Sequence, residues 1–200
     1  MGLAVMILGL VLLLGAHVFT TRRKARAQLI ATIGDGTYKI LYSLVSLAGL
    51  ALIVWGYASY RSAGIIDVWE HLVPANVMRV LKHIALALML PAVILVVASY
   101  IRGRMFTTLK HPMLAGIKVW AAGHLLANGD LGSIILFGSF LAWAVYDRIS
   151  LKYRADSGAP PIPVGGVTND LIAVVIGFVA YLALLFAFHP VVIGVPVVGS

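Results

Sequence analysis

The residues of this chain best suited to chemistry are its histidines. The sequence has six histidines and no cysteine, so imidazole is the expected ligand for any bound metal. The lack of cysteine excludes disulfides, thiolate catalysis and covalent c-type haem. His17 and His124 lie inside strongly apolar blocks. Because ionisable residues within a membrane usually face the protein interior and serve a function, these two are the first candidates for ligands.

The remaining histidines have simpler explanations. His71 lies in an outer loop and is expected to be solvated, and His189 stands at the end of the last apolar block as a residue of the membrane interface. His83 lies near the outer end of another block, where it can face lipid headgroups or the bundle. His111 precedes Pro112, a residue that suits the first position of a helix. The expected role of His111 is therefore helix initiation.

Helix geometry limits how the polar residues of the stretch KVWAAGHLLANGD, residues 118–130, can work together. At about 100° per residue, Trp120, His124 and Asn128 form one stripe. His111 precedes His124 by 13 residues. That separation corresponds to about 220° of rotation and roughly 20 Å of rise. His111 and His124 therefore cannot share one metal ion.

Other polar residues of this stretch have structural explanations. Lys118 can extend its charge toward the cytoplasmic side of the membrane. Asp130 can cap the helix that begins at Leu131, and Asn128 can satisfy late carbonyls of the preceding helix. His124 has no comparable explanation.

Membrane helices must position these residues. The chain of 200 residues is 62% apolar and 11% charged, with a mean hydropathy of +1.02, whereas soluble domains are about 45–50% apolar and about 25% charged. A span needs roughly 20 mainly apolar residues. Spans are expected over residues 2–20, 40–60, 80–100, 112–128, 131–147 and 170–188. The predicted fold class is an all-α integral membrane protein, one domain over residues 1–200, with about six transmembrane helices, or about five if 112–128 is re-entrant.

Basic residues cluster between the apolar blocks. The net charge is +8, and the clusters lie at 22–26, 102–110 and 148–154. This pattern favours anionic headgroups and the positive-inside rule over nucleic acid, which is excluded as a partner. The basic loops are then cytoplasmic, which places both termini outside. The first block lacks a positive leader and a cleavage site, so we expect it to be a retained helix.

The connecting segments carry further expectations. Residues 61–76 have apolar residues at helical spacing, which predicts a short helix in the outer interface. Residues 154–170 are rich in turn formers, and no regular structure is expected there. The proline-containing tail, residues 189–200, is too short for a seventh span.

A bis-histidine haem b needs imidazoles from facing helices, with aromatic residues nearby. Two intramembrane histidines on different helices meet this requirement, although nothing in their spacing is unique to haem. The stretches GAHVFTTRRKARAQL, YSLVSLAGLALIVWGY and KHPMLAGIKVWAAGHLLANGDLGSIILFGSF together resemble the NnrU family of bacterial membrane proteins. The resemblance covers nearly the whole chain and implies a multi-pass protein of the bacterial inner membrane.

The resemblance also implies a cofactor and its ligands. The family is associated with nitrite and nitric oxide reduction in denitrifying bacteria, and it is similar to plant 15-cis-zeta-carotene isomerase, a haem b enzyme. Lys110, His111 and Pro112 hold the place of that enzyme's Arg-His-Pro motif, which lies thirteen residues before a proposed haem ligand. The resemblance therefore implies His17 and His124 as the axial ligands of the haem iron.

The depth of the two residues in the membrane keeps a second pair open. His17 lies five residues from Arg22, and His124 lies fourteen from Lys110. In straight helices these spacings correspond to depths of about 7–8 Å and about 21 Å from the inner surface. His83 matches His124 better in depth, because both lie near the outer surface, and it is the reserve partner.

Three functions follow from these considerations. The first is a haem b protein of nitrogen-oxide metabolism, which as an enzyme would isomerise a lipophilic substrate with haem as a redox switch. The second is methyl transfer from S-adenosylmethionine, because the His-Pro motif at His111 is similar to that of membrane methyltransferases. Here Lys110 replaces that motif's arginine, and neither its tyrosine after the proline nor its late Asn-Glu pair is present.

The third function is that of a haem or ligand carrier that assists a reductase. Expected partners are the lipid bilayer, a lipophilic small molecule and a redox partner.

Overall fold

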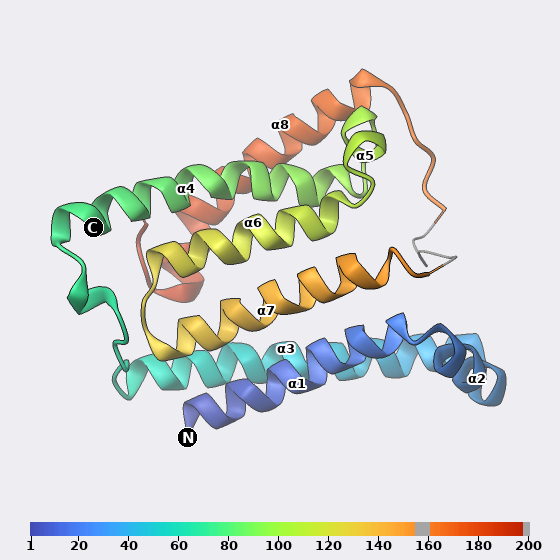
Figure 1. Cartoon of the computed structure of the whole chain (residues 1–200), viewed down its shortest axis with the longest axis horizontal. Helices are drawn as coiled ribbons and strands as arrows, with labels where there is room; N and C mark the ends of the chain where they lie inside the picture. The colour runs from blue at the N-terminus through green and yellow to red at the C-terminus, as the bar shows by residue number, and fades with distance from the viewer. Residues whose placement is uncertain (155–160, 198–200) are drawn as a thin grey trace.

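The computed structural model describes residues 1–154 and 161–197, and over these residues the regular structure is helical (Figure 1). The long helices are α1 Gly2–Thr21, α3 Asp35–Ser62, α4 Ala75–Ala98, α6 Pro112–Ala127, α7 Leu131–Ser150 and α8 Val167–Ala183. Shorter elements are α2 Arg23–Ile33, η1 Glu70–Leu72, α5 Arg104–Leu109 and η2 Leu184–Ile193, which continues α8. The prediction of an all-α fold is confirmed for this part of the chain.

Five of the described helices are long and apolar enough to cross a membrane: α1, α3, α4, α7 and α8 with η2. α6 has 16 residues, a length of about 24 Å, against a hydrocarbon core of about 30 Å. In Figure 1, α6 nevertheless runs from the end at α5 to the opposite end of the bundle. The chain is a multi-pass membrane protein, and a sixth span over 112–128 stays a prediction.

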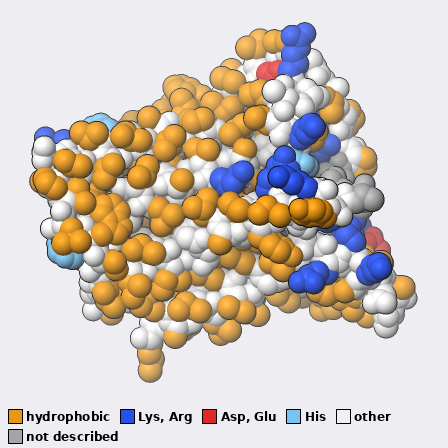
Figure 2. All heavy atoms as spheres, in the orientation of Figure 1, with side chains coloured by type: hydrophobic (Ala, Val, Ile, Leu, Met, Phe, Trp, Pro, Cys, Tyr) orange, Lys and Arg blue, Asp and Glu red, His pale blue; other side chains and the backbone are white. Residues whose placement is uncertain are grey.

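The surface matches a lipid environment. Large apolar side chains such as Trp55, Leu171 and Val175 are more than half exposed, which in water would be costly over so wide an area. Figure 2 shows a broad hydrophobic face, with most of the visible lysines and arginines gathered toward the end that carries α2 and α5. This end is called the basic end below, and the other is called the outer end.

The helices pack as two groups joined by α7. α1 packs tightly on α3, while α4 packs on both α6 and α8, and α7 contacts α6 and α1. Glycines permit the close approach of α1 and α3: a Cβ added to Gly56 would lie 2.3 Å from the backbone nitrogen of Met6. Small residues are the usual means by which membrane helices pack closely.

The prediction of a helix over 61–76 is wrong, apart from the three-residue turn η1. This loop pairs instead with the α6–α7 turn: Val68 donates its N–H to the carbonyl of Gly129 at 2.9 Å, and Leu131 donates to the carbonyl of Ile66 at 2.8 Å. Asp67 and Asp130 form an isolated bridge at the same place. Backbone groups used in this pairing are not available for a helix.

The basic end holds two helices that the sequence did not predict, α2 and α5. The Asp170 carboxylate accepts hydrogen bonds from the amides of Arg104 and Met105, both at 3.0 Å, which satisfies the first turn of α5. Residues 161–166 lack regular structure, as predicted, and 155–160 of that predicted loop lie outside the described residues. For residues 167–170 the prediction is wrong, because they form the first turn of α8. The last helix ends at Ile193, and residues 198–200 of the tail also lie outside the described part.

Candidate functional site

His124 lies near the outer end of α6, half-buried in the bundle. Its Nδ1 is 2.9 Å from the carbonyl oxygen of Trp120. Because a carbonyl only accepts, Nδ1 carries the proton, and Nε2 of the neutral ring keeps its lone pair for a ligand. A histidine that binds a metal commonly donates its other N–H to a backbone carbonyl in this way.

Aromatic rings form the surroundings of His124. The ring of Phe137 lies 4.4 Å from the His124 ring, centre to centre, with the planes inclined by 26°. Trp120 lies 5.1 Å away on the same helix and meets Phe137 and Phe140 of α7 edge-on. The prediction that Asn128 satisfies a late carbonyl of the helix is confirmed, because Asn128 Nδ2 donates to the carbonyl of His124 at 2.8 Å.

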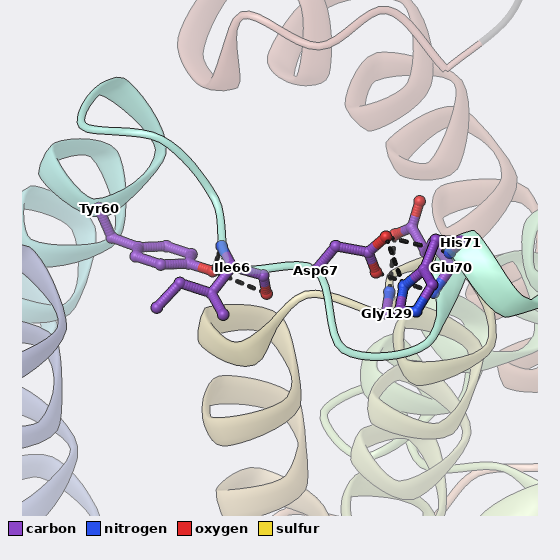
Figure 3. Close-up of polar contacts among 6 residues, drawn as sticks. All are labelled: Tyr60, Ile66, Asp67, Glu70, His71 and Gly129. Carbon is purple, nitrogen blue, oxygen red and sulfur yellow. Dashed lines mark hydrogen bonds and ion pairs between the residues drawn. The ribbon is translucent and has the colours of Figure 1, made fainter.

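The outer loop holds the end of α6 in place (Figure 3). Glu70 Oε1 accepts the N–H of Gly129 at 2.7 Å, and Asp67 accepts the N–H of Glu70 at 2.9 Å. On the side of α3, the amide of Ile66 donates to the hydroxyl of Tyr60 at 2.8 Å. The turn that follows His124 is therefore fixed by side chains from the loop as well as by its own backbone.

Asp130 caps α7, as the sequence predicted. Its carboxylate accepts the N–H of Ser133 at 3.0 Å, and Asp130 itself is buried. The cap satisfies an amide of the first helical turn that would otherwise lack a partner. It therefore fixes the start of the helix that supplies Phe137.

His189 is the residue that sequence reasoning missed. It lies in η2, a π-helical segment that continues α8 and contains Pro190. Its ring centre is 6.3 Å from that of His124, and the two planes are inclined by 22°. The Nδ1 atom of His189 is buried without a hydrogen-bond partner among the described residues. A separation of 65 residues with no shared motif gives no sequence signal for this contact.

His17 lies in a different cluster. Its Nδ1 is 2.7 Å from the carbonyl oxygen of Leu13, so this nitrogen carries the proton. Nε2 therefore accepts a hydrogen bond from the hydroxyl of Tyr42, at 3.0 Å. The edge of Trp143 completes the contacts, 5.4 Å away from centre to centre. Both nitrogens of His17 are engaged.

The structure does not bring His17 and His124 together. His17 lies four residues before the end of α1 at the basic end, whereas His124 lies three residues before the end of α6 at the outer end (Figure 1). α1 stops at Thr21, because Arg22 leaves the helical conformation, so this helix does not continue into the basic segment. That His17 and His124 share one iron stays a prediction.

The other predicted residues lie apart from this site. His83, the reserve partner, is exposed on α4, with Nδ1 2.7 Å from the carbonyl oxygen of Arg79. His71 is exposed and pairs with Asp67 at 3.1 Å. His111 directly precedes α6, whose first residue is the proline that the sequence predicted there.

The comparison with protein families covers almost the whole chain. The family model described as NnrU protein matches residues 5–197. The chain belongs to the NnrU family. No curated protein and no solved structure matches it.

The donor set of this NnrU family member limits the metals that it could bind. Among residues 1–154 and 161–197, no group of three or more His, Asp or Glu side chains is placed to hold a metal ion. A bare ion at His124 and His189 would therefore have only two protein ligands. A metal ion held by a macrocycle, which supplies nitrogen ligands of its own, needs no more than two ligands from the protein.

Proposed function

We propose that the protein binds haem b within the membrane, with His124 as one axial ligand. The observation that carries this proposal is the hydrogen bond from Nδ1 to the Trp120 carbonyl, which leaves Nε2 of this half-buried imidazole unprotonated, with a lone pair for a ligand. When bound, haem would supply a redox-active iron.

The surroundings of His124 also suit a flat, apolar cofactor. Phe137 and Trp120 are within 5.1 Å of the imidazole, centre to centre, and aromatic rings pack well against a macrocycle. His189 adds a second imidazole with a buried, unpartnered nitrogen. These groups fit haem better than a bare metal ion, for which a third protein ligand is missing among the described residues.

The second axial ligand is a choice among His17, His83 and His189. The resemblance implies His17, and binding there would require Tyr42 to release Nε2. His83 is exposed on α4 and would have to turn into the bundle.

We propose a role in nitrite and nitric oxide metabolism, in the inner membrane of a bacterium, and membership of the NnrU family supports this role. The protein would act there as an isomerase of a lipophilic substrate or as a haem carrier for a reductase. Genetic complementation tests whether the site at His124 is needed for the physiological role of the protein. A strain lacking the gene should recover nitric oxide consumption with the wild-type gene and not with His124→Ala.

Purified protein tests haem binding directly. Protein produced in haem-replete cells should show a Soret band that sharpens on reduction, with haem quantified against protein. His124→Ala should lose most of this absorbance, while His71→Ala, in the exposed outer loop, should keep it. A colourless wild-type protein would refute the proposal.

Methyl transfer is the second candidate, and the half-buried His111 at the basic end favours it. The positive charge of Arg148 acts on this histidine more strongly than the negative charge of Asp147, and a cationic side chain there would attract the carboxylate of S-adenosylmethionine. Calorimetric titration should then give heat that His111→Ala removes. The absence of heat at millimolar cofactor would eliminate this function.

A further inference from the structure

We infer that His189 is the second axial ligand, so that the haem iron lies between His124 of α6 and His189 of η2. This inference rests on the proposed function. It replaces the partner that the resemblance implied with one that the structure brings to His124.

The separation of the two rings carries the inference. Two imidazoles that bind one metal ion from opposite sides have their ring centres about 6 Å apart. Each side contributes a metal–nitrogen bond of about 2.0 Å and roughly 1.1 Å from the nitrogen to the ring centre. The ring centres of His124 and His189 are 6.3 Å apart, with planes 22° from parallel. This separation is larger than that of the stacked rings of His124 and Phe137, whose centres are 4.4 Å apart.

Each of the two rings has a nitrogen that could bind a metal ion. Nε2 of His124 has its lone pair free, because Nδ1 donates to Trp120. Nδ1 of His189 is buried and finds no hydrogen-bond partner among the described residues. A buried imidazole nitrogen without a partner is costly in a membrane protein, and bonding to a metal would remove that cost.

The backbone around His189 points to the same role. η2 is π-helical over Leu184–Ile193, and π-helical turns are rare and occur often at functional sites. α6 packs on α4 and α7, whereas η2 continues α8, which packs on α4. A flat group between His124 and His189 would therefore not have to separate helices that pack extensively on each other.

Spectroscopy of the purified, haem-loaded protein distinguishes the candidate pairs. The wild type should be low-spin with bis-imidazole features in electron paramagnetic resonance. His189→Ala should become high-spin and recover the low-spin spectrum on addition of imidazole. His189→Met should give the spectrum of a mixed histidine–methionine iron, which a merely structural role of His189 would not produce.

The matched controls are His17→Ala and His83→Ala, which should keep the bis-imidazole spectrum. If His189→Ala and His189→Met keep it and one of these controls loses it, the inference is wrong while haem binding stands. A wild-type protein without haem would overturn both. Size-exclusion chromatography establishes that each variant is folded.

Discussion

At the scale of single residues, the histidines differ in what occupies their second ring nitrogen. His17, His83 and His124 all direct Nδ1 at the carbonyl four residues earlier. Tyr42 then takes Nε2 of His17. The contact of Nδ1 within its own helix is the same in all three histidines. The partner of Nε2 differs, because it depends on the neighbouring helix. This is why the sequence could name candidates for a ligand pair but could not choose between them.

His111 gives a prediction about pH. Burial, followed by the positive charge of Arg148, lowers the pKa of His111 from its usual 6.5. The unfolded chain therefore takes up this proton first as the pH falls, so the stability associated with a neutral His111 is present above about pH 6.5 and is lost below it. The melting temperature in detergent should fall between about pH 7.5 and about pH 5.5, and it should fall less in His111→Gln.

The control for this prediction is His83→Gln. His83 is an exposed histidine on α4, and replacing it should leave the pH dependence of the wild type. Equal slopes for both variants and the wild type would show that His111 does not contribute to acid destabilisation.

Local chemistry was predictable at residue scale, and long-range contacts were not. The cap at Asp130 and the amide of Asn128 were predicted because both bonds join residues within one turn of each other. His189 was predicted to lie at the membrane interface. Its contact with His124 depends on how α8 packs against α4, for which the sequence carries no local signal.

At the scale of elements, the contact between α1 and α3 depends on glycine. Gly2 and Gly9 of α1 face Gly56 and Gly49 of α3, and an added Cβ at any of them would lie within 2.8 Å of backbone atoms of the facing helix. A backbone cannot move aside as a flexible side chain can. The two helices would therefore have to separate.

We predict that Gly56→Ala destabilises the protein by about 1–3 kcal/mol, the usual range for overpacking. Gly138→Ala is the matched control, because an added Cβ there meets nothing within 4 Å and alanine favours a helix by up to about 1 kcal/mol over glycine. Thermal unfolding in detergent measures both. Equal melting temperatures would contradict the close packing of α1 and α3.

The apolar blocks located the spans to within a few residues, because hydropathy reports directly on lipid exposure. α2 and α5 were missed because their basic residues were interpreted as loop. The helix predicted over 61–76 failed for the opposite reason: the spacing is helical, but its backbone is paired with Gly129 and Leu131. Tertiary hydrogen bonds overrode the local pattern at this end.

At the scale of the whole molecule, α7 joins the α1–α3 pair to the group of α4, α6 and α8. The outer loop makes a second connection, because Ile66 and Val68 bond across to Leu131 and Gly129. The basic end has its own connection, where Gly165 donates to the carbonyl of Arg102 at 2.7 Å. Both ends are therefore held by backbone hydrogen bonds between distant parts of the chain.

Topology gives a prediction at this scale. If α6 spans the membrane, a reporter fused after Tyr153 should be cytoplasmic and one after Ser200 should be periplasmic. If α6 is re-entrant, α7 and α8 reverse direction relative to the membrane and both signals exchange. A reporter inserted after Lys24, which the positive-inside rule also makes cytoplasmic, serves as the internal reference in either case.

The glycine contact of α1 and α3 also bears on how the chain is made. All four glycines lie before residue 57, so the first hairpin has its complete interface while later segments are still on the ribosome. α4 and α6 form a second pair of neighbours, and the contacts of α7 and α8 come last. We therefore expect packing to follow the order of translation, with the first hairpin serving as the template in the lipid bilayer for the segments that emerge after it.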